Sequence, residues 1–89
     1  MPPHSDTLVL HPDILFRAVD DEGVVVDQRQ PEVMVVNAQA VEILELIRQT
    51  SSRNAVLNEL QQKYDADRAL ITADLDVFLG ELRTRQMLV

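Results

Sequence analysis

The apolar pattern of the chain changes its period once, at Asn37, and this change limits the folds that are available. Before Asn37, apolar residues stand in short runs separated by turn-forming residues, which is typical of strands. After Asn37, apolar residues recur three and four positions apart, as they do on one face of a helix. Because all strands then precede all helices, no βαβ crossover is expected, and the pattern predicts an α+β domain.

Three short strands are predicted before Asn37, over residues 14–19, 24–27 and 33–36. The cluster Asp20-Asp21-Glu22-Gly23 indicates a turn, so the first two strands should form a hairpin. Pro31 suits the connection to the third strand and would be unfavourable inside it. We therefore expect a three-stranded antiparallel sheet in which the third strand is an edge.

Three helices are predicted after the sheet, with Asn37 as the N-cap of the first, a stop and a cap in Thr50-Ser51-Ser52, and Asp67 as the cap of the third. A small sheet beside the last two helices would give a winged helix-turn-helix-like domain. The stripes expected to face the core are Ala40, Ile43, Leu44 and Ile47, then Val56, Leu57, Leu60 and Tyr64, and finally Ile71, Leu75, Phe78 and Leu82.

The chain of 89 residues has room for one domain. Residues 1–13 contain three of the four prolines and are predicted to form a flexible or extended N-terminal arm, of which only Leu8, Val9 and Leu10 could dock. Residues 14–89 are expected to form the single folded domain.

The net charge of −7 arises from fifteen acidic and eight basic side chains. This charge repels nucleic acid and anionic membrane surfaces, so neither is expected as a partner. The sequence has no apolar run near the length of about 20 residues that spans a bilayer, and its start lacks the features of a signal peptide, so we expect a cytoplasmic protein.

The residues that usually carry catalysis are scarce. The two histidines, His4 and His11, both fall in the predicted arm, and cysteine is absent. Asp74 and Asp76 stand two positions apart on a helix and so do not face each other. With only two glycines, no phosphate-binding loop is available. We expect no catalytic residues, no cofactor, no metal site and no enzyme activity.

The third strand, Val33-Met34-Val35-Val36, has features of a binding edge. It is apolar on both faces and has no lysine to discourage pairing with another strand. An added peptide strand is one occupant of such an edge. Alternatively, the N-terminal arm covers it, or a second copy of the chain pairs with it in a homodimer.

A row on the third helix mixes apolar and acidic residues beside the predicted core stripe. Its members are Leu70, Asp74, Val77 and Glu81, at i, i+4, i+7 and i+11. If this row borders the edge strand, the two form a groove that binds a peptide by β-augmentation. The alternative is that the apolar members of the row only pack at the edge of the core.

A DNA-binding winged helix is disfavoured by the third helix itself. Along most of its length this helix offers Asp74, Asp76 and Glu81, and its arginines lie at its ends, whereas a recognition helix needs cationic or amide side chains. An acidic winged-helix interaction or regulatory module remains as the alternative to a peptide-binding domain.

The sequence resembles the PqqD-like family. The residues that carry the resemblance are Gly23-Val24-Val25-Val26-Asp27, Val36-Asn37, Ala40, Ile43, Leu44, Leu60, Tyr64-Asp65-Ala66-Asp67, Asp74-Leu75, Phe78-Leu79, Leu82 and Leu88. That family comprises the peptide chaperone of pyrroloquinoline quinone biosynthesis and the precursor-peptide recognition elements of ribosomally made, modified peptides, including lasso peptides. The chain departs from the family pattern at Arg85-Gln86 and at Ser51-Ser52-Arg53, where many relatives have glycine.

The resemblance implies a protein that binds the leader of a precursor peptide and presents it to a separate enzyme. That enzyme would be a radical S-adenosylmethionine protein in the quinone pathway or a leader peptidase in lasso systems. By the same resemblance, Val33, Met34, Val35 and Val36 would pair with the leader backbone. Leu70, Val77 and Phe78 would form pockets for leader side chains, and Asp74 and Glu81 would favour a basic leader residue.

Overall fold

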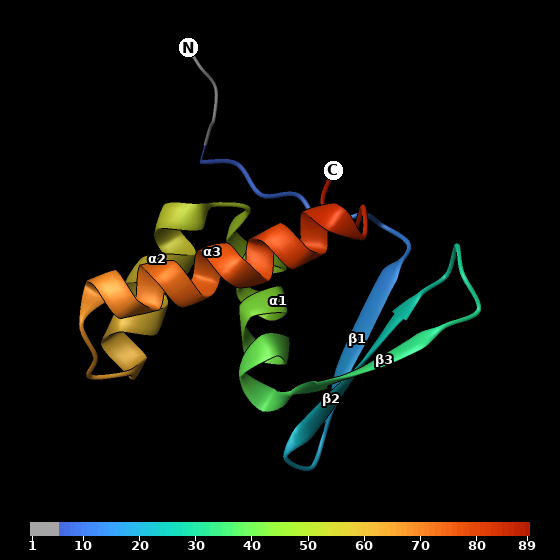
Figure 1. Cartoon of the computed structure of the whole chain (residues 1–89), viewed down its shortest axis with the longest axis horizontal. Helices are drawn as coiled ribbons and strands as arrows, with labels where there is room; N and C mark the ends of the chain where they lie inside the picture. The colour runs from blue at the N-terminus through green and yellow to red at the C-terminus, as the bar shows by residue number, and fades with distance from the viewer. Residues whose placement is uncertain (1–5) are drawn as a thin grey trace.

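The structure is a computed structural model that describes residues 6–89, and it consists of three strands followed by three helices (Figure 1). The elements are β1 (Ile14–Val19), β2 (Glu22–Asp27), β3 (Val33–Asn37), α1 (Ala38–Thr50), α2 (Arg53–Lys63) and α3 (Arg68–Thr84). The strands form one antiparallel sheet in the order β1-β2-β3. The predicted α+β class, with a three-stranded antiparallel sheet followed by three helices, is confirmed. His4 and the start of the predicted arm lie outside the described residues.

The first hairpin is tighter than predicted, because its turn consists of Asp20 and Asp21 alone. Val19 pairs with Glu22, and Asp20 has a left-handed φ of 55°. The placement of Gly23 in the turn was wrong, since this residue lies inside β2. A Cβ atom at Gly23 would stand only 1.9 Å from Cγ2 of Val41, so the glycine allows α1 to lie directly on the sheet.

Side-chain caps begin all three helices, as predicted. The Asn37 side chain accepts a hydrogen bond from the Ala40 N–H at 2.8 Å, and the Asp67 side chain accepts one from the Ala69 N–H at 3.0 Å. Ser52 caps α2 by accepting a hydrogen bond from the backbone of Ala55 at 3.1 Å. Each cap satisfies a backbone N–H that has no partner within its helix.

The helices pack in sequence: α1 packs against all three strands, α2 against α1, and α3 against α2. On α3 the core face differs from the predicted stripe, because the buried residues are Leu75, Leu79 and Leu82. Ile71 and Phe78 are only half-buried. The helix carries apolar residues on two adjacent faces, and spacing alone does not show which face packs against the core.

The described part of the N-terminal segment runs in an extended path beside the C-terminal residues (Figure 1). The Leu8 N–H donates to the Ser51 carbonyl at 3.0 Å, and the His11 N–H donates to the Met87 carbonyl at 2.8 Å. Leu8 and Leu10 are buried, whereas Val9 is exposed. These contacts hold the segment against the α1–α2 connection and the C-terminus, and the segment leads into β1, on the opposite edge of the sheet from β3.

The end of α1 offers a test of backbone strain. Ser51 has a φ of 54°, in the left-handed region where any residue other than glycine is disfavoured. We expect Ser51→Gly to raise the free energy of unfolding by about 0.5–1 kcal/mol, after the entropy that glycine gains in the unfolded chain is subtracted. Urea denaturation would measure this. Ser51→Ala, which keeps the Cβ, should bring no gain, and a glycine variant no more stable than the alanine variant would contradict the assignment.

Candidate functional site

A groove of about 560 Å³ separates β3 from α3. Because α3 packs on α2, it stands opposite β3 across this space, and α1 provides the floor. The groove is lined by Met34, Val36 and Asn37 at β3, by Gln39, Ala40 and Ile43 of α1, by Leu60, Tyr64 and Ala66 at α2 and after it, and by Leu70, Ile71, Asp74, Leu75, Phe78, Glu81, Leu82 and Arg85 at α3. Most of these side chains are apolar, so the groove favours apolar groups.

The β3 wall presents alternate side chains to the groove. Met34 and Val36 line it and are half-buried. Val33 and Val35 are 57% and 67% exposed and lie on the opposite face of the sheet. Of the four strand residues predicted to form the site, two therefore contribute side chains to the groove.

The backbone pattern of β3 follows from the pairing of β1 with β2. The Gln28 N–H donates to the Asp13 carbonyl at 2.9 Å, directly beyond the last pair of the β1–β2 register. In an antiparallel pair, positions that hydrogen-bond to the neighbouring strand alternate with positions that do not. Counting from Asp13, which precedes β1, every second residue therefore bonds to β2. The intervening β2 residues, Gly23 and Val25, consequently direct their backbone groups toward β3.

Gly23 pairs with Val36 and Val25 pairs with Met34. The backbone groups of Met34 and Val36 are thus used within the sheet, and by the same alternation those of Val33 and Val35 point outward from the free edge. Residues therefore alternate along the edge strand. Met34 and Val36 direct side chains into the groove, and Val33 and Val35 direct backbone N–H and C=O groups outward from the edge.

The opposite edge of the sheet, at β1, is covered in part by a side chain from α1. Arg48 donates from Nη2 to the Ile14 carbonyl at 2.7 Å, and its guanidinium carbon lies 4.7 Å from the centre of the Phe16 ring. The Ile14 N–H donates to the His11 carbonyl at 3.0 Å. The start of β1 therefore has its outward backbone groups satisfied, whereas within residues 6–89 no hydrogen bond reaches the outward backbone groups of Val33 and Val35.

The α3 wall contains four of the five residues that were predicted for it. Leu70, Asp74, Phe78 and Glu81 line the groove, whereas Val77 is 67% exposed and is not part of the lining. The groove also takes in residues that the prediction did not include, among them Ile71 and Tyr64, which the spacing had placed in the core. The helical spacing of the apolar residues does not distinguish a residue that faces the groove from one that faces the core.

Tyr64 is held in place at the groove by a charged neighbour. Its hydroxyl donates to Glu42 Oε1 at 2.7 Å, and Lys63 forms an ion pair with the same carboxylate. The hydrogen bond to Glu42 raises the pKa of Tyr64. Burial alone would raise the pKa of Glu42, but the hydrogen bonds from Lys63 and Tyr64 outweigh this effect and lower it. The Tyr64 hydroxyl therefore stays protonated and donates a hydrogen bond to Glu42.

The charged groups of the groove lie on α3. Asp74 and Glu81 are exposed carboxylates at its rim, and Arg85 stands at the end of the helix. Two carboxylates beside an apolar groove favour a ligand that carries a positive charge near its apolar groups.

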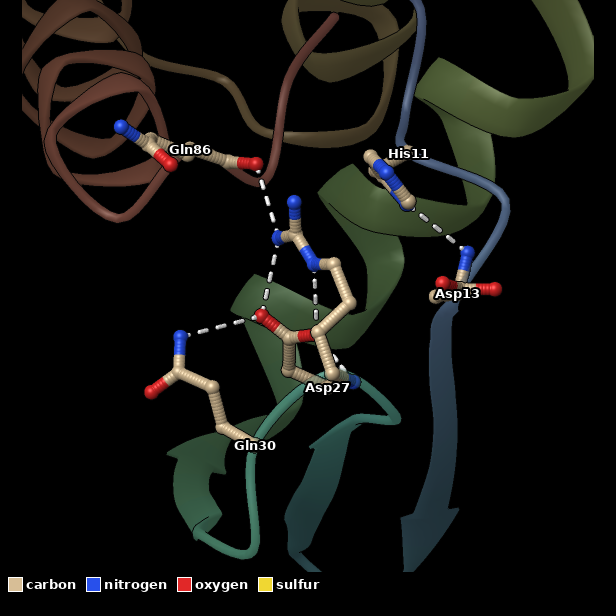
Figure 2. A network of polar contacts seen from close by, with 6 residues as sticks. His11, Asp13, Asp27, Gln30 and Gln86 are labelled. Carbon is tan, nitrogen blue, oxygen red and sulfur yellow. Dashed lines mark hydrogen bonds and ion pairs between the residues drawn. The ribbon is translucent and has the colours of Figure 1, made fainter.

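Arg29 links the β2–β3 connection to the end of α3 through Asp27 and Gln86, which are labelled in Figure 2. It lies in the connection between β2 and β3, donates from Nε and Nη2 to the Asp27 carboxylate at 2.9 Å each, and donates from Nη2 to the Gln86 carbonyl at 2.8 Å. Gln86 follows α3 and has a left-handed φ of 59°. This contact fixes the spacing between the β2–β3 connection and the end of α3. The hydrogen bonds from Arg29 lower the pKa of Asp27 to about 2.

A second cavity, of about 300 Å³, continues the groove beside this network. Met34 and Arg85 line both spaces, so the two are adjacent. The second cavity is more polar, with Asp27, Gln30, Glu32, Thr84 and Gln86 among its lining residues.

Comparison with known proteins identifies the family. Residues 22–88 match the family described as "Coenzyme PQQ synthesis protein D (PqqD)". The chain belongs to the PqqD family. The resemblance inferred from the sequence is therefore confirmed. No curated protein matches the sequence. Among solved structures, the fold of this PqqD-family chain is similar to that of "TbiB1 in Complex with the TbiA(beta) Leader Peptide", with a TM-score of 0.80 and 20% identity over 90% of this chain and 93% of that chain.

Over residues 6–89, no group of three or more His, Cys, Asp or Glu side chains is placed to hold a metal ion. In the same part of the chain, no helix has the length and apolar character needed to cross a membrane.

The Asp27–Arg29 contact gives the PqqD-family chain a pH dependence that can be measured. The pKa of Asp27 is lowered in the folded state, so the stabilisation is present above the ordinary aspartate pKa of 3.8 and is lost as the pH falls toward 2. We expect Asp27→Asn to melt at a lower temperature than the wild type at neutral pH, and this difference should shrink between about pH 4 and about pH 2.

Thermal melts followed by circular dichroism across this pH range would test the assignment. Asp65→Asn removes one exposed carboxylate from the α2–α3 connection and controls for the change in net charge. A difference between Asp27→Asn and the wild type that stays constant down to pH 2 would contradict it.

Proposed function

We propose that this PqqD-family protein is a non-catalytic peptide chaperone, which binds the leader region of a ribosomally made precursor as a strand added to β3. The observation that carries the proposal is an open edge strand forming one wall of an apolar groove. Membership of the PqqD family supports it, as does the similar fold of a protein whose structure was solved with a leader peptide.

The backbone of Val33 and Val35 supplies the hydrogen bonds to the added strand. Because side chains of a strand alternate between its two faces, every second leader residue points into the groove. There it meets Met34 and Val36 on one side and Leu70 and Phe78 on the other. A leader that fits carries apolar side chains at alternate positions. Val77 is not included in the proposed site, because its side chain lies outside the groove lining.

Selectivity for charge comes from Asp74 and Glu81 on α3. Both are exposed at the rim, so a basic leader residue that follows the apolar ones lies near a carboxylate. Such a rim contact contributes more to selectivity and association rate than to total affinity.

Chemistry on the precursor belongs to a separate enzyme, to which this protein presents the bound leader. A radical S-adenosylmethionine protein or a leader peptidase is the class of enzyme that such a chaperone serves in the family. A backbone ladder with two or three apolar anchors supplies roughly 8 kcal/mol, which corresponds to micromolar affinity.

The proposed pairing predicts which amides a leader protects from hydrogen exchange. The amides of Val33 and Val35 should exchange more slowly when a cognate leader saturates the protein, because they gain hydrogen-bond partners. Those of Met34 and Val36 should change less, because they already pair with β2. Exchange measured by NMR residue by residue would test this. Unchanged exchange at both Val33 and Val35 in the saturated complex would exclude strand addition at this edge.

The acidic rim predicts a charge effect. Asp74→Lys should weaken the binding of a leader that carries Lys or Arg opposite it by about 1–3 kcal/mol, while the melting temperature stays near that of the wild type. Glu59→Lys makes the same change of charge at an exposed position on α2 outside the groove lining and should leave affinity nearly unchanged. Isothermal titration calorimetry would compare the three proteins, and equal losses in both variants would show that only net charge matters.

A further inference from the structure

The face of the sheet that points away from the helices is largely aliphatic. From the strand register, this outer face carries three rows, which are Leu15, Val26 and Val33, then Arg17, Val24 and Val35, and then Val19 and Glu22. Six of these eight residues are Leu or Val. Leu15 and Val19 are 46% and 45% exposed, and Val33 and Val35 are more exposed still.

Such a surface departs from what an antiparallel sheet normally shows to water. When one face packs on a core, the other face usually carries polar residues. Here β2 places Val24 and Val26 on the outer face and Val25 in the core, so the strand is apolar on both sides. Because this face is aliphatic where most sheets are polar, it is a candidate site of protein contact.

The size of the outer face shows that a stable partner has to contact more than this face. With strands about 4.8 Å apart and a rise of about 3.3 Å per residue, three strands of five or six residues give a face of roughly 250 Å². A partner that covers this face alone would bury roughly 500 Å² in total, well below the roughly 1,200–2,000 Å² of stable interfaces. For a second copy of the chain, the net charge of −7 on each copy adds repulsion.

Charge at the border of the face indicates the chemistry of the partner. Asp20 and Asp21 form the β1–β2 turn at one end of the face, and Glu22 begins β2 directly after them. Within residues 6–89, the ion pairs of the structure leave these three carboxylates unneutralised. Arg17 is the single cation among the eight residues of the outer face.

We propose that the outer face of the sheet docks the enzyme that acts on the leader-bound precursor, through an aliphatic patch bordered by Lys and Arg on that enzyme. This inference rests on the proposed leader-binding function. A leader added beside Val33 and Val35 becomes the fourth strand of the sheet, so its outward-pointing side chains extend the same face. The enzyme thereby contacts the chaperone and the leader together and binds the loaded complex more tightly than the empty protein.

The test uses the purified enzyme that acts on the precursor, titrated against the leader-loaded protein by biolayer interferometry. The double variant Leu15→Asn/Val19→Asn changes β1, on the opposite edge from the leader site. It should bind leader within twofold of the wild type and bind the enzyme at least tenfold more weakly. Val9→Asn makes the same type of change at an exposed aliphatic position outside the sheet and should bind the enzyme as the wild type does.

A second variant tests the charged border without touching the aliphatic residues. Asp20→Lys/Glu22→Lys lies at the turn and should weaken enzyme binding and reduce its salt dependence. If the asparagine variant fails to fold, as seen from lost leader binding and thermal melts, this variant decides the question alone.

Two results would overturn the proposal. One is enzyme binding unchanged in the folded outer-face variants. The other is a dimer of the wild-type protein in sedimentation that Leu15→Asn/Val19→Asn dissociates, which would make a second copy the occupant. A wild-type protein that binds no leader would instead contradict the proposed function, and the same enzyme titration on the unloaded protein would still decide the role of the outer face.

Discussion

The close contact between α1 and β2 at Gly23 sets the geometry of the molecule. Any side chain at this position would collide with the buried Val41, so the glycine lets α1 lie flat across all three strands. With α1 covering the inner face of the sheet, α2 packs on α1, and α3 packs on α2 instead of on the sheet. The distance between α3 and β3, and hence the groove, is a consequence of this stacking order.

Local signals in the sequence were sufficient to predict the strands and helices of the fold. The caps at Asn37 and Asp67 and the change of apolar period were enough to place the strands and helices, because each signal acts within a few residues. Gly23 was assigned to the turn because glycine beside aspartates usually marks one. Its actual role depends on Val41, eighteen positions away, and such a contact leaves no local signal.

The site was predictable only in outline for a similar reason. The last strand of a meander is an edge, so the β3 wall could be placed from the order of elements. Val33 and Val35 have outward backbone groups, whereas Met34 and Val36 have groove-facing side chains. This alternation depends on the hydrogen-bond register of the other two strands. On α3, apolar residues occupy two faces, and only packing distinguishes the buried Leu79 from the groove-lining Phe78.

The two edges of the sheet differ in whether their outward backbone groups have hydrogen-bond partners within residues 6–89. This difference is relevant to how a protein with an exposed sheet edge avoids aggregation. At β1, Arg48 donates a hydrogen bond to the outward-pointing carbonyl of Ile14. At β3 the outward backbone groups have no hydrogen-bond partner within residues 6–89, and such an edge usually invites pairing between sheets. Here α3 stands across the groove from β3 and narrows the approach to that edge. Under the proposed function, the wall that would select the leader would therefore also protect the edge from unwanted pairing.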